Sequence, residues 1–352
     1  MEMNHFMKYK CLKHTTILIS VFALFVMISG CASAKTAPRT DSLSASLTDQ
    51  SASSAKLIKA ESTKRAEADN AAEPQEEPAA IAESPSDASS ALPDTTQISA
   101  TVSHPEWAAY FGELNGAAVI LDPEENTCQI YNEVLAGVRR SPCSTFKIIS
   151  SLAGLENSVI DPDHSIRSWS GETFWNDDWN QDMDFSTAFH TSCVWYYRQV
   201  IDDLGPDTMQ KTLDALHYGN CDITDWEGHL NNNNNNPSLT GFWIESSLKI
   251  CPREQAAVMK QIFDSSSAYS PDTLSALEEV MFLSQDSTDD CKIYGKTGMG
   301  KSNGIVVDAW YTGFADADHR IYFCVYLGET AGQDVSSARA REIAVSLIKQ
   351  NY

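Results

Sequence analysis

The sequence places a serine and a lysine at a spacing that can create an activated nucleophile. Ser144 and Lys147 belong to a Ser-Thr-Phe-Lys segment at the start of a predicted helix. Residues three apart on a helix are neighbours, so the amine can meet the hydroxyl, which is a weak nucleophile until a base takes its proton. Only about 1 in 2,500 ordinary lysines is neutral at pH 7, but burial beside Phe146 and Ile149 lowers the pKa. Alone, this spacing also fits an amphipathic helix with a surface lysine.

Two further polar motifs follow in the sequence. The run Lys296-Thr297-Gly298 has a strand-like context and a glycine on each side of Lys-Thr, which lets a ligand's amide approach closely. Its lysine and threonine offer a cation and a hydroxyl to a carboxylate. Between the two motifs, Ser192 offers a second hydroxyl in a Ser-Cys-Val triplet that begins an apolar helical run. Taken singly, the first segment is more often a turn with a solvated lysine, and the triplet carries no signal.

The order of the motifs is more specific than any one of them. Ser-x-x-Lys, then Ser-x-Val, then Lys-Thr-Gly is the signature of the penicillin-recognising acyl-serine enzymes, in which Ser-Asp-Asn is a related second element. Tyr-Gly-Asn at 218–220, Phe-Trp-Ile-Glu at 242–245 and Trp-Tyr-Thr-Gly at 310–313 accompany it. With these segments, the chain resembles the class D (oxacillinase-type) serine β-lactamases over about Trp107 to Tyr352.

The resemblance implies hydrolysis of β-lactam antibiotics through an acyl-enzyme. Ser144 takes the place of the nucleophile, and Lys147 that of the lysine that adds carbon dioxide to form a carbamate and acts as general base. Trp243 matches the tryptophan whose indole N–H stabilises the carbamate. Ser192 is expected to relay a proton to the leaving nitrogen, and Val194 to line the pocket beside the carbamate. No bound cofactor or metal is expected beyond this carbon dioxide.

The resemblance also implies how the substrate is held. Lys296–Gly298 would bind the substrate carboxylate and its amide side chain, and the backbone N–H groups of Ser144 and Met299 would form the oxyanion hole. An arginine near the last helix is expected to pair with the carboxylate. Arg341 is the preferred candidate, although the register does not distinguish it from Arg339.

The pattern of the remaining sequence predicts an α+β fold of the β-lactamase/transpeptidase-like type. Strand-like runs at both ends of the domain, with helices between them, indicate an antiparallel five-stranded sheet flanked by helices, with an inserted helical lobe. The expected strands are Gly116–Leu121, Thr127–Tyr131, Lys292–Tyr294, Ile305–Thr312 and Ile321–Leu327. The expected helices are one that follows Pro142, then Thr187–Leu204, Pro206–Leu216, Pro252–Phe263, Pro271–Leu283 and Ser336–Lys349.

The first 103 residues have a different composition from the rest. Residues 1–30 combine lysines, an apolar run and a small-residue end, as a signal peptide does. Ile-Ser-Gly-Cys resembles a lipobox, so Cys31 is the expected lipid attachment site. Residues 31–103, rich in Ala, Ser, Glu and Pro, read as a disordered tether. Residues 104–352 then form the catalytic domain, which is expected to be exported across the cytoplasmic membrane and held by lipid at its extracytoplasmic face.

Charge and cysteine spacing exclude several other classes. The 48 acidic and 25 basic side chains give a formal net charge of −23, which argues against a nucleic-acid partner. No Cys-x-x-Cys pair or His-Glu-x-x-His run supports a zinc site. Cys143 and Cys193 adjoin the two serines and are expected to be small buried residues, with an oxidation-sensitive thiol pair as the alternative.

Some questions stay open at the level of sequence. The rivals to hydrolysis are a penicillin-binding sensor that stays acylated, a peptidoglycan transpeptidase, and a surface binding module with an inactive site. The insertion Trp226–Gly241, which contains Asn231–Asn236, is expected to form a surface loop that changes which drugs fit if it borders the site. Neither the oligomeric state nor the range of β-lactams hydrolysed follows from the sequence.

Overall fold

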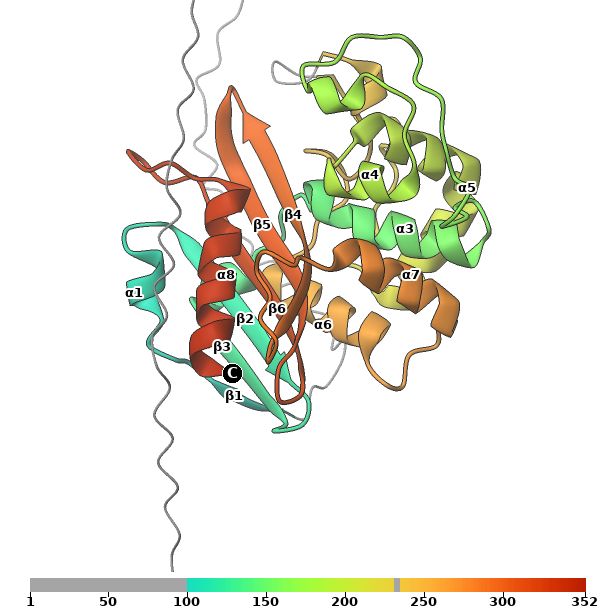
Figure 1. The fold of residues 1–352 in the computed structure, drawn as a ribbon. Helices are drawn as coiled ribbons and strands as arrows, with labels where there is room; N and C mark the ends of the chain where they lie inside the picture. Colours follow the sequence, from blue (N-terminus) through green and yellow to red (C-terminus); the bar gives the residue numbers. More distant parts are fainter. Residues whose placement is uncertain (1–99, 231–234) are drawn as a thin grey trace, which may run out of the picture. The chain divides into compact units, whose positions relative to one another are not determined.

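A six-stranded sheet is the centre of the fold. A computed structural model describes residues 100–230 and 235–352. In these residues the sheet has the strand order β1-β3-β2-β6-β5-β4 (Figure 1). The strands are β1 (Thr101–Ser103), β2 (Gly116–Asp122), β3 (Thr127–Tyr131), β4 (Lys292–Ser302), β5 (Ile305–Asp316) and β6 (Arg320–Gly328).

The predicted α+β class is confirmed, but the predicted sheet of five antiparallel strands is wrong. The sixth strand is β1, which pairs with β3 in parallel, whereas the other four pairings are antiparallel. All three residues of β1 are exposed, so it has no buried alternation that could reveal a strand in the sequence. It also lies just before residue 104, where the predicted catalytic domain begins.

The sheet separates two hydrophobic cores. Along β2, Ala117, Val119 and Leu121 belong to one core, whereas Ala118 and Ile120 belong to the other. This alternation follows from the two-residue period of a strand. Helix α8 (Ser337–Asn351) covers one face, and α6 (Pro252–Phe263) with the helical lobe lies on the other (Figure 1).

The helical lobe positions the first two motifs. It contains α3 (Lys147–Glu156), α4 (Phe185–His190), α5 (Val194–Leu216) and α7 (Pro271–Met281), drawn together in Figure 1. The remaining helices are α1 (Ala108–Phe111) and α2 (Glu133–Ala136), with short 3-10 turns η1 (Cys143–Phe146), η2 (Asp177–Trp179) and η3 (Pro237–Leu239). The predicted helix Pro252–Phe263 is confirmed with its exact bounds. The predicted helix Pro206–Leu216 is the second part of α5, beyond a kink at Gly205, where φ is 73°. The helix after Pro142 and the two last helices are confirmed within a few residues.

The predicted single helix Thr187–Leu204 is wrong, because the structure has two helices there. Asp184 caps α4 by accepting a 2.7 Å hydrogen bond from the Thr187 backbone N–H. Between α4 and α5, Ser192 adopts a left-handed backbone with φ of 56°. A left-handed residue cannot continue a right-handed helix, so Ser192 lies in the connection between the two helices.

Three predicted N-terminal features lie outside the described residues. They are the signal sequence 1–30 and the lipid site Cys31, together with the tether up to residue 99. In the part of the chain that the structure does describe, no helix is both long enough and apolar enough to span a bilayer.

Candidate active site

The Ser144 turn joins the lobe to the sheet. Ser144 lies in η1, directly before α3. Cys143 has a left-handed φ of 50°, and its N–H donates to the Trp243 carbonyl over 3.0 Å. Thr145 Oγ1 donates to the Pro142 carbonyl over 2.7 Å and accepts from Gln255 of α6 over 2.8 Å. These bonds fix the turn on both sides of the serine.

The structure brings Ser144 and Lys147 together as predicted. Lys147 Nζ lies 2.9 Å from Ser144 Oγ, and the lysine is only 1% exposed. Burial lowers the pKa of Lys147 to about 8. Near pH 7, about 1 in 10 such lysines is neutral, compared with 1 in 2,500 for an ordinary lysine. The amine is therefore available as a base or as a nucleophile toward carbon dioxide.

A second serine–lysine pair contributes to the same site. Lys296 Nζ, from β4, donates a hydrogen bond to Ser192 Oγ in the α4–α5 connection. Lys296 is 5% exposed, and its pKa lies well below the ordinary value because of burial and, next, the charge of Lys147. Gly298, two residues after Lys296 on β4, approaches the Ser144 turn so closely that a Cβ there would lie 3.1 Å from the Thr145 backbone nitrogen. All three motifs therefore converge in one site.

Trp243 and Val194 lie where the lobe packs behind this site. Trp243 is fully buried, and its ring stacks against Phe146 at a centroid distance of 6.0 Å. Val194 begins α5 directly after the Ser192 connection and is 9% exposed. The main chain before Trp243 is close-packed, since a Cβ on Gly241 would lie 2.1 Å from the indole.

Strand β4 passes against the Ser144 turn. A Cβ on Gly298 would lie 2.9 Å from the Pro142 carbonyl oxygen, so only glycine fits without a shift of the main chain. Lys296 and Gly298 share one face of the strand, whereas Thr297 and Met299 alternate with them. Met299 is 41% exposed. Strand β4 ends the strand order, and near its start Ile293 and Tyr294 already pair with the segment that follows α7. The edge beyond Tyr294 is the part that could pair with an extended ligand.

Both candidate arginines are ion-paired on α8. Arg341 binds Asp286 through two hydrogen bonds of 2.6 and 2.9 Å. Arg339 pairs with Glu342 at 2.9 Å. The structure thus places Arg341 in an ion pair within the chain, and a role toward a substrate carboxylate stays a prediction for either residue.

The cysteines beside the two serines are buried thiols. Cys143 and Cys193 are free, as are the other cysteines of the described residues. Burial raises the pKa of the Cys193 thiol to about 11 and that of Cys143 still higher. Both thiols therefore stay protonated near neutral pH and pack as small apolar groups. Within 100–230 and 235–352, no group of three or more acidic, histidine or cysteine side chains could hold a metal ion.

Several residues that support the site could not be predicted from the sequence. Gln255 is one, and Ser141, whose hydroxyl contacts the Trp243 segment, is another. Neither belongs to a motif, and their partners lie more than 100 residues away. Arg198 donates a 2.8 Å hydrogen bond to the Trp226 carbonyl at the start of the predicted insertion. Residues 231–234 of the insertion lie outside the described residues.

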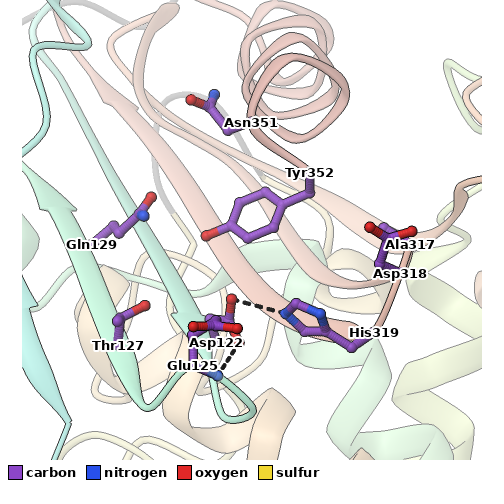
Figure 2. Close-up of a pocket in the computed structure, with 9 residues that line it drawn as sticks. All are labelled: Asp122, Glu125, Thr127, Gln129, Ala317, Asp318, His319, Asn351 and Tyr352. Carbon is purple, nitrogen blue, oxygen red and sulfur yellow. Dashed lines mark hydrogen bonds and ion pairs between the residues drawn. The ribbon is translucent and has the colours of Figure 1, made fainter. Parts of the chain in front are cut away.

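A separate pocket of about 410 Å³ contains none of these residues (Figure 2). It lies where the β2–β3 turn, the β5–β6 turn and the end of α8 meet. His319 forms a 2.9 Å ion pair there with Asp122, which is 3% exposed, and Tyr352 lies beside them. The pocket is therefore distinct from the serine–lysine site.

The fold and the site together define a penicillin-recognising protein of the acyl-serine class. A helical lobe packs on a sheet, and a buried Ser-x-x-Lys pair lies with a second Ser–Lys pair in one site. The chain belongs to the family described as the penicillin binding protein transpeptidase domain, whose model matches residues 93–349.

Its relatives include both a probable hydrolase and a regulatory protein. The probable β-lactamase YbxI of Bacillus subtilis is 27% identical over 241 residues, which cover 68% of this chain and 82% of that protein. The regulatory protein BlaR1 of Bacillus licheniformis is also 27% identical, over 70% of this chain but only 39% of BlaR1. A solved class D β-lactamase from B. subtilis has the same fold, with a TM-score of 0.61 at 24% identity, covering 70% of this chain and 95% of the other.

Proposed function

We propose that this protein hydrolyses β-lactams through an acyl-enzyme on Ser144. The observation that carries the proposal is the 2.9 Å approach of Ser144 Oγ to a lysine that burial makes easier to deprotonate. A serine needs such a base to attack a carbonyl. The similarity to YbxI supports a hydrolytic outcome.

The surroundings of Lys147 fit a carbamate. Only a neutral amine adds carbon dioxide, and the lysine is buried with its pKa lowered to about 8. Its Nζ lies 5.4 Å from the centre of the Tyr197 ring, in the same region as Trp243. A carbamate on Lys147 would supply the general base for both acylation and deacylation. The indole N–H of Trp243 is the donor proposed to stabilise it.

The other residues bind the substrate and move a proton. Ser144 Oγ passes its proton to the general base on Lys147 as it bonds to the β-lactam carbonyl carbon, and the oxygen that becomes anionic is held by the backbone N–H groups of Ser144 and Met299. When the carbon–nitrogen bond breaks, Ser192 gives its proton to the nitrogen and is reprotonated through Lys296. The charged form of Lys296, with Thr297, binds the substrate carboxylate, and water releases the acyl group.

Turnover and intact mass test the proposal together. The protein with Ser144 intact should hydrolyse a chromogenic cephalosporin, and bicarbonate should raise the rate after carbon dioxide has been removed. Ser144→Ala should show neither turnover nor a mass increase with penicillin. Lys147→Ala should lose about 10²–10⁴-fold in turnover, the usual contribution of a general base. Unchanged deacylation in Lys147→Ala would contradict the carbamate role.

A penicillin-binding sensor is the second candidate, favoured by the similarity to the regulatory protein BlaR1. In that case the same residues would acylate, but the adduct would persist. A stoichiometric mass increase of one penicillin that outlasts the assay, without turnover, would establish the sensor and overturn the hydrolase.

The proposed setting is an extracytoplasmic membrane surface, reached through a lipid on Cys31. This proposal depends only on the sequence motif. Cys31→Ser should move the protein from the membrane fraction to the soluble fraction. Retention of that variant in the membrane would show that something else anchors it.

A further inference from the structure

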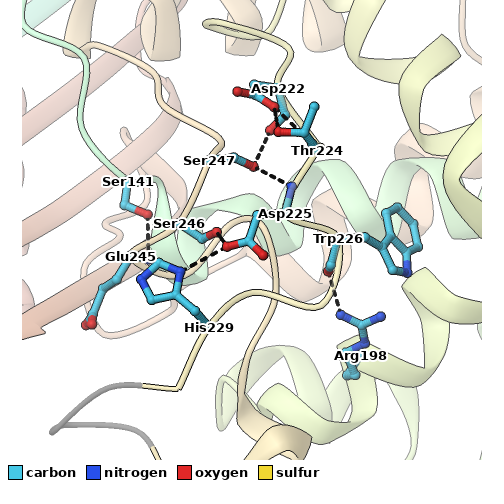
Figure 3. Close-up of polar contacts among 10 residues, drawn as sticks. All are labelled: Ser141, Arg198, Asp222, Thr224, Asp225, Trp226, His229, Glu245, Ser246 and Ser247. Carbon is cyan, nitrogen blue, oxygen red and sulfur yellow. Dashed lines mark hydrogen bonds and ion pairs between the residues drawn. The ribbon is translucent and has the colours of Figure 1, made fainter.

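The Ser141 hydroxyl joins the nucleophile segment to the tryptophan segment. Ser141 is 2% exposed and lies three residues before Ser144. Its Oγ donates to the Trp243 carbonyl over 3.1 Å and accepts from the Glu245 backbone N–H over 2.8 Å. Figure 3 shows the contact with Glu245. One hydroxyl thus donates to one residue and accepts from another more than 100 positions away in the sequence.

Ser141 is itself held on the sheet side. Its carbonyl accepts a 3.0 Å hydrogen bond from the indole N–H of Trp310 in β5. Trp310 is fully buried and packs against Tyr326 of β6 at a centroid distance of 4.4 Å. Ser141, which precedes η1 in the chain, is therefore bonded to the sheet through its carbonyl, while its hydroxyl bonds the Trp243–Glu245 segment.

The segment that it binds is strained and depends on such contacts. Glu245 has a left-handed φ of 52°, which is unfavourable for a residue with a side chain. Its carboxylate accepts a 2.6 Å hydrogen bond from the Lys301 N–H of β4, and its backbone N–H goes to Ser141. A residue in this conformation persists only when its surroundings fix it from several directions.

The same contact fixes the carbonyl of Trp243. That oxygen accepts from both the Ser141 hydroxyl and the Cys143 N–H. The Trp243 ring lies between Phe146, one residue before Lys147, and the main chain at Gly241. A shift of the Trp243–Glu245 turn would therefore move the indole relative to Lys147.

We propose that Ser141 is a positioning residue that holds the Trp243 indole in place relative to Lys147. Loss of its hydroxyl therefore weakens carbon dioxide binding at Lys147 rather than nucleophilic attack by Ser144. This inference rests on the proposed carbamate mechanism. The Ser141 hydroxyl bonds to Trp243 and Glu245 and not to Ser144 or Lys147, so it acts through the turn that contains Trp243.

The test compares Ser141→Ala with the wild-type protein and with Ser150→Ala. Ser150 is a matched control, because it is a fully buried serine that donates to the Phe146 carbonyl over 3.1 Å and does not contact Trp243. Carbamate formation is read from the ¹³C NMR signal during titration with ¹³C-bicarbonate at fixed pH. Turnover of a chromogenic cephalosporin is measured at each bicarbonate concentration.

Ser141→Ala should need about tenfold more bicarbonate for half-maximal carbamate signal, the loss typical of one buried hydrogen bond. Saturating bicarbonate should restore its turnover to within about twofold of wild type, and Ser150→Ala should titrate like wild type. An unchanged titration, or a turnover defect that saturating bicarbonate does not rescue, would overturn the positioning role. If the wild-type protein gives no carbamate signal at all, the carbamate mechanism fails, and this inference fails with it.

Discussion

Lys296 Nζ donates a hydrogen bond to Ser192 Oγ, although the two residues lie 104 positions apart on an edge strand and a helix connection. The contact unites the second and third motifs and closes the site on the side facing Ser144. Both members depend on a local feature: Ser192 on its left-handed backbone and Lys296 on its place on the inner face of β4. Because Lys296 is buried, its charged form is costly until an anion arrives.

Replacing Lys296 should therefore mainly affect anionic substrates. For Lys296→Met, we expect kcat/KM for a carboxylate-bearing cephalosporin to fall about 10–100-fold, as for the loss of a hydrogen bond to a charged group. The fall should be smaller for the methyl ester of the same compound, which lacks the charge. Lys349→Met, on the exposed end of α8, serves as the control and should keep wild-type kinetics. Equal losses on acid and ester would instead assign Lys296 to proton transfer alone.

The lowered pKa of Lys147 predicts how carbon dioxide uptake depends on pH. Only the neutral amine reacts, and burial brings its pKa to about 8 from 10.5. After acid treatment to remove the carbamate, recovery of activity at a fixed dissolved carbon dioxide concentration should accelerate about tenfold per pH unit below 8 and level off above it. Stopped-flow pH jumps measure this rate. A rate still rising tenfold per unit at pH 10 would show that the lysine is not perturbed.

The close approach of β4 to the Ser144 turn predicts that Gly298→Ala is harmful. Its Cβ would meet the Pro142 carbonyl at 2.9 Å, so either the strand or the turn must move. A displacement there misplaces Met299 N–H relative to Ser144, and loss of one oxyanion donor typically lowers kcat by about 10²–10³-fold. In Gly137→Ala the added Cβ has no contact closer than 3.7 Å, so this control should keep both activity and melting temperature. If Gly298→Ala has wild-type kcat, the strand is not constrained by the turn.

The chemistry of the site could be predicted from the sequence because local spacing determines it. The three-residue spacing from Ser144 to Lys147 places the two side chains together in any helix, and the structure has them 2.9 Å apart. The continuous apolar run of β2 likewise reveals a strand that is buried on both faces.

The rest depends on contacts that no local pattern encodes. The exposed strand β1 exists only because β3 offers it a parallel partner. Ser192 interrupts an apolar helical run through a backbone conformation that its sequence does not require. The hydroxyl of Ser141 and the amide of Gln255 support the nucleophile turn through partners more than 100 residues away, and an isolated polar residue gives no sign of such a partner.

The ion pair of His319 and Asp122 predicts a pH-dependent contribution to stability. Hydrogen bonding to Asp122 raises the pKa of His319, and the nearby charges of Glu124 and Glu125 act in the same direction against the cost of burial. A histidine whose folded pKa is raised stabilises the fold fully below its unfolded pKa of about 6.5, and the contribution disappears as pH rises through the folded value. His319→Gln should thus lower the free energy of unfolding by on the order of 1 kcal/mol at pH 5.5, and by much less at pH 9. Urea denaturation of the wild-type and variant proteins at both pH values gives the difference.

His164→Gln is the control for this prediction. The His164 side chain is 80% exposed beside Asp161, so its replacement should change stability little at either pH. A destabilisation by His319→Gln that is the same at pH 5.5 and pH 9 would show that the histidine contributes through packing and not through its charge.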